Sequence, residues 1–123
     1  MKTNEIRIEI KAARKKVFEF TVEPKNKTKW MTTIDSEICN TEQISIGSLY
    51  TNNNGTYEVS DYEKDVFFEL THKETGYICS YSYHKVDENT TELVYFESMD
   101  DGSDLTEPME RKHFEKLKEL LEK

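Results

Sequence analysis

His113 is the side chain whose position in this sequence is best suited to chemistry near neutral pH. A histidine gains or loses a proton in that range, so it serves as a general acid or base, or as a hydrogen-bonding group. At about 100° per residue, His113 projects from the middle of an apolar helical face that includes Met109 and Phe114. Two interpretations stay open: His113 faces a cavity, or it is a core histidine satisfied by a tyrosine or serine, which is the simpler of the two.

Glu97 is a second candidate, and its role depends on the register of its strand. If Leu93 faces the interior, Glu97 does too, because side chains alternate along a strand. The competing register turns Val94 and Phe96 inward and reverses every side chain. A buried Glu97 beside His113 would form an acid–base pair with shifted pKa values. We favour the alternative, in which Glu97 is solvated and has no chemical role.

Tyrosines at alternating positions could supply aromatic walls and hydroxyl groups for a ligand. Tyr81 and Tyr83 share one strand face, and Tyr95 shares the face of Glu97. Whether these tyrosines line a cavity or pair across the sheet as ordinary core stays open. The candidate ligand-binding residues are mostly aromatic, and they are Trp30, Phe68, Tyr81, Tyr83, Tyr95, Met99, Met109, His113 and Phe114.

The sequence has no signature of metal, phosphate or serine-nucleophile chemistry. His72, His84 and His113 show no ligand spacing with one another or with the two cysteines. The glycines mark turns and form no phosphate loop, and no serine stands in a G-x-S-x-G elbow. We therefore expect no metal and no cofactor, and catalytic activity stays open.

Composition narrows the range of partners. The formal net charge is −8, and nucleic acids or anionic membrane surfaces require a basic partner. No apolar run approaches the roughly 18 residues that span a bilayer, and the N-terminal residues lack a secretory pattern. Cys39 and Cys79 have no metal-type spacing and are expected to be reduced thiols, since a disulfide would need an oxidising compartment. We expect a cytoplasmic protein that binds no nucleic acid and does not insert into membranes.

The elements that must position these residues are mostly short strands. A helix is expected at the C-terminal end, with Asp104 or Thr106 as its cap and Pro108 in its first turn. Hairpin-length connections make the strands antiparallel, and clustered strands with segregated helices predict an α+β fold in one domain, residues 1–123. The expected elements are strands over 5–10, 34–42, 48–51, 56–62, 66–71, 77–86 and 91–99, and helices over 12–22, 24–31 and 105–123.

Several segments carry a resemblance to a known superfamily. They are VFEF at 17–20, EPKN at 23–26, Trp30, IGS at 46–48, YSY at 81–83, TTEL at 90–93 and LKELLE at 117–122. With the opening strand, these segments resemble the START/Bet v 1-like (SRPBCC) superfamily, and more narrowly its bacterial polyketide cyclase/dehydrase-like branch. The resemblance covers nearly the whole chain.

The resemblance implies a helix-grip fold, in which a curved antiparallel sheet of about six to seven strands wraps around a long C-terminal helix and encloses a cavity. Two short helices follow the first strand. It implies a small hydrophobic or aromatic ligand, such as a lipid, as the partner. The helix expected here has about 18 residues, or about 27 Å, which argues against a large enclosed cavity.

Two other functions on the same fold stay open. The first is a cyclase or dehydratase in which His113 handles protons, with Tyr83 or Glu97. The second is an interaction module similar to chaperone-ATPase activators, which would use the outer face of the sheet. A homodimer is compatible with either function.

Overall fold

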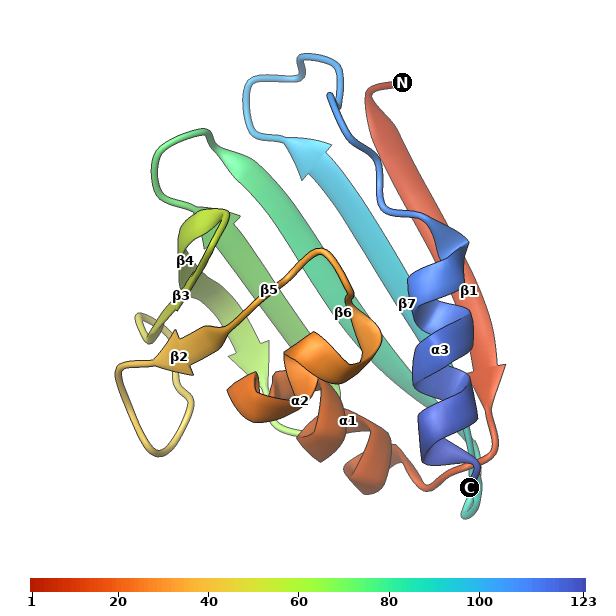
Figure 1. The fold of residues 1–123 in the computed structure, drawn as a ribbon. Helices are drawn as coiled ribbons and strands as arrows, with labels where there is room; N and C mark the ends of the chain where they lie inside the picture. Colours follow the sequence, from red (N-terminus) through yellow and green to blue (C-terminus); the bar gives the residue numbers. More distant parts are fainter.

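Seven antiparallel strands form one sheet in the computed structural model, which describes residues 1–123. Their order across the sheet is β1-β7-β6-β5-β4-β3-β2, and Figure 1 shows the sheet curving along this order. The strands are β1 (Thr3–Ile10), β2 (Glu37–Cys39), β3 (Leu49–Asn52), β4 (Gly55–Glu63), β5 (Phe67–His72), β6 (Tyr77–Asp87) and β7 (Thr90–Met99).

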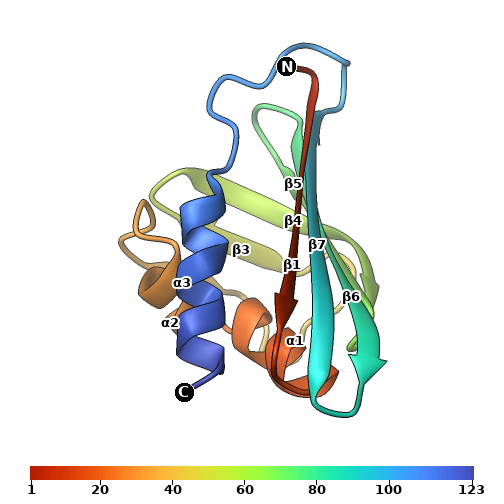
Figure 2. The same cartoon turned by 90° about the vertical axis from the view of Figure 1, so that its right-hand side faces the viewer.

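Three helices lie on the concave side of this sheet. They are α1 (Arg14–Val22), α2 (Pro24–Trp30) and α3 (Arg111–Leu121). The C-terminal helix α3 lies over β1 and β7, and α1 and α2 cover one end of the sheet (Figure 1). Figure 2 shows α3 standing apart from the strands, with the segment after β7 arching over to it. The α+β helix-grip architecture expected from the sequence is confirmed.

Local sequence explains the regular strands. In β1, Ile6, Ile8 and Ile10 are buried, and the alternating polar residues face outward. The predicted hairpin over 52–55 is present, with Asn52 paired to Gly55. Gly55 has φ of +125°, and a Cβ there would lie 2.4 Å from Nε2 of His72. The turn therefore needs glycine for both its conformation and its space.

The core is rich in aromatic rings that join α3 to the sheet. Phe114 is fully buried, and its ring centroid lies 5.3 Å from that of Trp30 and 5.0 Å from that of Tyr95. Leu117 and Leu121 extend the buried face of α3. Aromatic rings bury large areas, so this cluster supplies much of the interior of a small protein.

The register of β7 corrects one sequence-based expectation. Leu93, Tyr95 and Glu97 point into the interior, and Glu97 is 1% exposed, whereas Phe96 is 39% exposed. The favoured solvated orientation of Glu97 is therefore wrong. The cause is the pairing of β7 with β1, in which Ile8 lies opposite Leu93 and Ile6 opposite Tyr95, so the apolar faces coincide.

The C-terminal helix is shorter than expected, since it begins at Arg111 and has 11 residues. Residues 105–110 are not helical, so neither Pro108 in a first turn nor a cap at Asp104 or Thr106 is found. Two hydrogen bonds attach this segment to other parts of the chain. The N–H of Leu105 donates to the carbonyl of Met1, and the N–H of Met109 donates to Glu97 of β7. The strand expected over 34–42 is likewise reduced to Glu37–Cys39.

No helix of the structure has both the length and the apolar character needed to cross a membrane. Both cysteines are free thiols, with Cys79 buried and Cys39 half-buried.

Candidate functional site

A cavity of about 590 Å³ lies on the concave side of the sheet. Its aromatic wall consists of Tyr57, Tyr77, Tyr81 and Tyr95 from β4, β6 and β7. Facing this wall are residues of α2, of the loop that follows α2, and of the segment 103–110, together with His113 of α3. The lining contains both apolar and polar side chains, so the cavity suits a ligand with an apolar body that also carries polar groups.

Glu97 is the centre of a hydrogen-bond network in this lining. Its Oε1 accepts a 2.5 Å hydrogen bond from the hydroxyl of Tyr77, which also lies 2.6 Å from the hydroxyl of Tyr95. Its Oε2 accepts from Nδ2 of Asn4 at 2.7 Å and from the N–H of Met109 at 2.6 Å. All three donors are neutral groups, and no lysine or arginine forms an ion pair with Glu97. The carboxylate thus ties β1, β6 and β7 to the segment before α3.

Burial keeps the tyrosines of the cavity protonated. It is the main cause that raises the pKa of Tyr77, and electrostatic interaction with the nearby Cys79 thiol and Glu97 carboxyl raises this pKa further. The pKa values of Tyr81 and Tyr95 also lie well above the ordinary value, again chiefly because of burial. These phenols consequently act as neutral hydrogen-bonding groups rather than as bases.

A buried ion pair stands on the side of the cavity formed by α2 and β2. Nζ of Lys27 lies 3.5 Å from Oε1 of Glu37, and the two residues are 4% and 8% exposed. Although the charges are paired, Oε1 of Glu37 has no hydrogen-bond partner, so the contact is electrostatic and lacks hydrogen-bond geometry. Oε2 of Glu37 accepts from Nδ2 of Asn52 at 3.0 Å. The ring of Tyr50 lies 6.0 Å from Nζ of Lys27.

His113 lines the cavity from α3 and is 5% exposed. Its backbone N–H donates to the carbonyl of Glu110 at 3.3 Å. Neither ring nitrogen hydrogen-bonds to a protein group, so the tyrosine or serine partner considered for a core histidine is not found. The imidazole offers both a donor and an acceptor to a molecule in the cavity.

His72 also borders the cavity, but both of its ring nitrogens are used within the fold. Nδ1 lies 3.1 Å and 3.2 Å from the N–H groups of Glu74 and Thr75, and Nε2 lies 2.8 Å from the carbonyl of Asn54. Backbone N–H groups only donate, so Nδ1 is the acceptor and Nε2 carries the proton. His72 thereby joins the β3–β4 turn to the β5–β6 turn.

The structure brings together six of the side chains singled out in the sequence. The six that line the cavity are Tyr81, Tyr95, Glu97, Met99, Met109 and His113. The other four pack in the core and do not line it: Trp30, Phe68, Tyr83 and Phe114. Tyr83, for example, shares a 2.6 Å hydrogen bond with Thr21 of α1.

Sequence reasoning missed Lys27, Glu37, Tyr57 and Tyr77. Lys27 had one usable signal, because it stands three residues before Trp30 and so shares its helix face. Because lysine is seldom buried, a lysine in a sequence is normally assigned to the surface, and Lys27 was not considered as a lining residue. Tyr77 also had a signal, because alternation along its strand places it on the same face as Tyr81. Glu37 begins a strand of only three residues, which is too short for periodicity to assign a face.

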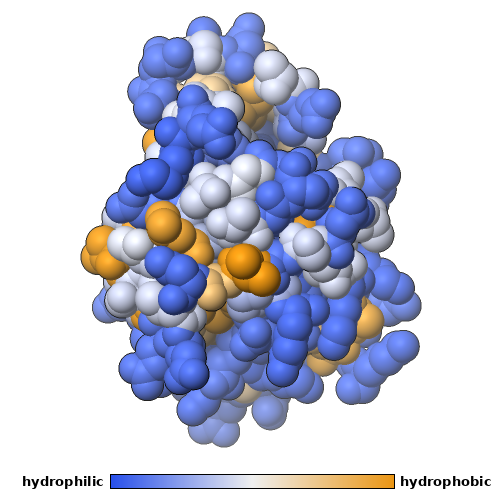
Figure 3. Space-filling model, turned by 60° about the vertical axis from the view of Figure 1, so that its left-hand side comes forward, coloured by the Kyte–Doolittle hydropathy of each residue, from blue (hydrophilic) through white to orange (hydrophobic).

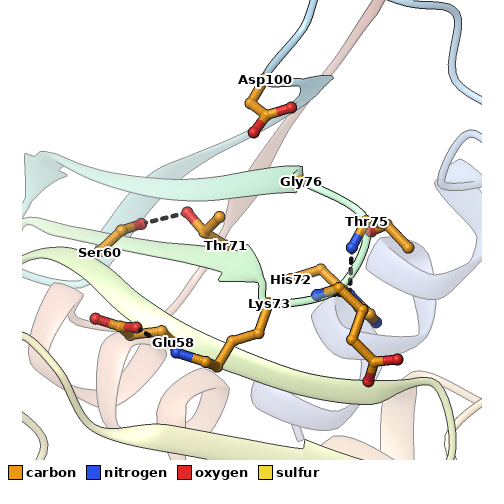
Figure 4. A pocket seen from close by; sticks show the side chains of 9 residues that line it. Glu58, Ser60, Thr71, His72, Lys73, Thr75, Gly76 and Asp100 are labelled. Atoms are coloured by element: carbon orange, nitrogen blue, oxygen red, sulfur yellow. Dashed lines mark hydrogen bonds and ion pairs between the residues drawn. The ribbon is translucent and has the colours of Figure 1, made fainter.

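A second hollow of about 580 Å³ is lined only by polar residues and glycine of β4, β5 and the β5–β6 turn, with Asp100 (Figure 4). Its side chains bind one another: Thr71 donates to Ser60 at 2.8 Å, and Lys73 contacts Glu58 at 3.1 Å. These side chains already pair with one another, so the hollow offers little to a ligand. No group of three or more histidine, cysteine or acidic side chains is placed to hold a metal ion.

Large apolar side chains are exposed at a few positions. Figure 3 shows a mostly hydrophilic face with small hydrophobic areas. Ile38 of β2 is 68% exposed and Ile46 of the β2–β3 loop is 64% exposed. The other exposed large apolar residues are Met1, Val86 and Phe96.

Comparison with known proteins gives structural relatives but no sequence relatives. No protein-family model matches the chain, and no curated protein matches its sequence. A conserved protein of unknown function from Enterococcus faecalis is 15% identical with a TM-score of 0.74, and the match covers 98% of this chain and 71% of that one. The Aha1 dimer from Colwellia psychrerythraea is 19% identical with a TM-score of 0.65, covering 99% and 97%. An HSP90 activator from Plasmodium falciparum is 13% identical with a TM-score of 0.64, covering 80% and 73%.

At these identities the similarity concerns the fold, which hosts many unrelated functions. The architecture, the order of the strands and the structural relatives agree with the resemblance noted in the sequence. The chain has the helix-grip fold of the START/Bet v 1-like (SRPBCC) superfamily.

Proposed function

We propose that this protein binds a small molecule with an apolar or aromatic body in the cavity between the sheet and α3. One observation carries the proposal: a cavity of about 590 Å³ with a wall of four tyrosines also presents His113, whose ring has no hydrogen-bond partner in the protein. Ligand sites of small molecules typically have about 300–1,000 Å³, apolar walls and a few polar groups.

A cyclase or dehydratase activity has less support from the same residues. Acid–base catalysis needs titratable groups that converge on the substrate. Glu97 accepts three hydrogen bonds from protein groups, and it shares none with His113. The tyrosines are held protonated by burial. The lining therefore supports holding a molecule better than transferring its protons.

The proposal is tested with N-phenyl-1-naphthylamine, a neutral probe whose fluorescence rises in apolar sites. Met109→Trp should fill the cavity and leave the backbone hydrogen bond to Glu97 intact, and Val86→Trp adds the same side chain at a position that is 54% exposed. We expect the parent protein and Val86→Trp to bind one probe equally, and Met109→Trp to bind about tenfold more weakly or not at all. Equal binding by all three proteins, or none by the parent, would overturn the proposal.

Native mass spectrometry of the protein purified from its own cells is the direct complement to this titration. A bound molecule that is present in the parent protein and absent from Met109→Trp would support the cavity as its site. A bound molecule retained by Met109→Trp would place its site elsewhere.

A second candidate function is interaction with a chaperone ATPase. The observation that favours it is the fold similarity to an HSP90 activator and to the Aha1 dimer. Exposed Ile38 and Ile46 near the edge strand β2 offer apolar contacts. If the protein has this function, it should raise the ATPase rate of an HSP90-class chaperone, and Ile38→Asp should reduce that effect more than Val86→Asp. Sedimentation analysis of the purified protein tests the homodimer.

A further inference from the structure

We infer that the ligand presents an uncharged acceptor oxygen, such as a ketone or amide carbonyl, to Nζ of Lys27. The inference rests on the proposed function and adds the chemical class of the ligand. It starts from Lys27, the one ammonium group in the lining of the cavity.

Lys27 has hydrogen-bonding capacity that the protein does not use. An ammonium group carries three N–H donors. Its one charged partner, Glu37, lies 3.5 Å away, and Oε1 of Glu37 has no hydrogen-bond partner. The ring of Tyr50 at 6.0 Å contributes an electrostatic contact but no acceptor oxygen. Nζ of Lys27 therefore donates no hydrogen bond within the protein.

Burial makes this unused capacity significant. Lys27 is 4% exposed and lines the cavity, so a ligand oxygen in the cavity would accept a hydrogen bond from a charged donor. The same ligand would bury its apolar body against Tyr81 and Tyr95, which line the cavity with Lys27. His113 lines it as well and offers a second hydrogen bond.

The charges of the lining argue against a charged ligand. Glu37 already compensates Lys27, so an anionic ligand would meet no excess positive charge. The remaining charged residues of the lining are all acidic and would repel an anion: Glu97, Asp104, Glu107 and Glu110. A cation gains little from the one buried acidic residue among them, because the oxygens of Glu97 already accept three hydrogen bonds. An uncharged oxygen accepts a hydrogen bond from Nζ of Lys27. It is not repelled by the acidic residues as an anion would be, and it needs no free carboxylate as a cation would.

The test uses four probes that share a naphthalene body: naphthalene, 2-acetylnaphthalene, 2-naphthoate and 2-naphthylmethylammonium. Affinities are measured by displacement of N-phenyl-1-naphthylamine. The parent protein should bind 2-acetylnaphthalene about tenfold more tightly than naphthalene, as expected for one hydrogen bond from a charged donor. It should bind the anion and the cation more weakly than the ketone.

The variant Lys27→Met should lose the preference for the ketone and keep its affinity for naphthalene. Because this substitution leaves Glu37 buried without its partner, the double variant Lys27→Met/Glu37→Gln provides a second protein in which no charge is stranded. Retention of the ketone preference in the double variant, or tighter binding of the anion or cation by the parent, would overturn the inference. Failure of the parent to bind any probe, naphthalene included, would instead overturn the proposed function.

Discussion

The backbone N–H of Met109 donates a 2.6 Å hydrogen bond to Oε2 of Glu97, and the C-terminal helix begins two residues later. This contact replaces the first turn that the sequence pattern around Pro108 predicts. Nδ2 of Asn4 donates to the same oxygen and also to the carbonyl of Met109. One buried carboxylate therefore holds residue 109 against β1 and β7, and α3 begins only beyond it.

Removing this carboxylate should destabilise the protein. Glu97→Ala removes the shared acceptor of three part-buried donors, and we expect the free energy of unfolding to fall by about 3 kcal/mol. Glu97→Gln keeps one acceptor oxygen and should lose less. Urea denaturation measures the free energy of unfolding of both variants.

The control is Glu92→Ala, on the same strand. The Glu92 side chain is 40% exposed and forms an ion pair with Arg7 at 3.6 Å. Its removal should lower the free energy of unfolding by less than about 1 kcal/mol. Equal losses for Glu97→Ala and Glu92→Ala would contradict the role of the network.

Phe114 should be a stability residue rather than a ligand contact. Its ring packs against Trp30 and Tyr95 and is fully buried, so Phe114→Ala should cost about 3–5 kcal/mol. Phe96→Ala removes the same group from a side chain that is 39% exposed and should cost far less. Thermal unfolding of the two variants decides the matter, and similar losses would show that Phe114 is not a packing centre.

The fold was predictable because local patterns and long-range pairing agree. The isoleucines of β1 alternate strictly, and the 52–55 turn carries glycine where a positive φ and close approach of His72 require it. Tyr81 and Tyr83 point to the same face, as their spacing predicted. Strand alternation and turn composition are local patterns, so a single sequence reveals them.

Much of the candidate site depends on contacts between distant residues. The burial of Glu97 follows from pairing with β1 and from Met109, and nothing in the β7 segment itself distinguishes the two registers. Lys27 is buried because Glu37, from a strand of only three residues, lies beside it. Tertiary contacts of this kind override the rule that lysine and glutamate stay exposed, so sequence periodicity alone could not locate these residues.

His72 should stabilise two turns at once. His72→Ala removes the acceptor for the N–H groups of Glu74 and Thr75 and the donor to Asn54. We expect a loss of about 2 kcal/mol and faster hydrogen exchange at the amides of residues 74 and 75. His84→Ala, at an exposed position of β6, is the matched control and should leave both quantities unchanged. Unchanged exchange in His72→Ala would argue against this link.

Alkaline pH should unfold the protein through its tyrosines. All seven have a raised pKa in the folded state, and burial raises that of Tyr57 from 10.0 to about 12. Between these values the folded state holds more protons than the unfolded state, so stability is full below pH 10 and falls as pH rises toward 12.

Tyrosinate absorbance and circular dichroism, followed together against pH, should therefore change in one step. Tyr57→Phe removes one titrating group whose hydroxyl makes no hydrogen bond, so its stability should fall less steeply with pH than that of the parent protein. Ionisation of most tyrosines near pH 10 with the structure intact would contradict the burial of their hydroxyl groups.

Cys79 should be the slow thiol of the pair. Burial raises its pKa to about 12, although the positive charge of Lys27 opposes this, and alkylation requires the thiolate. Cys79 is 5% exposed, whereas Cys39 is half-buried. The variant Cys39→Ser retains only Cys79, and Cys79→Ser retains only Cys39. Under native conditions we expect Cys39→Ser to react with iodoacetamide at least about tenfold more slowly than Cys79→Ser. Mass spectrometry measures both rates. In urea the two variants should react alike, because unfolding removes the difference in burial. Equal rates in the folded state would show that the sheet opens around Cys79 more readily than its packing indicates.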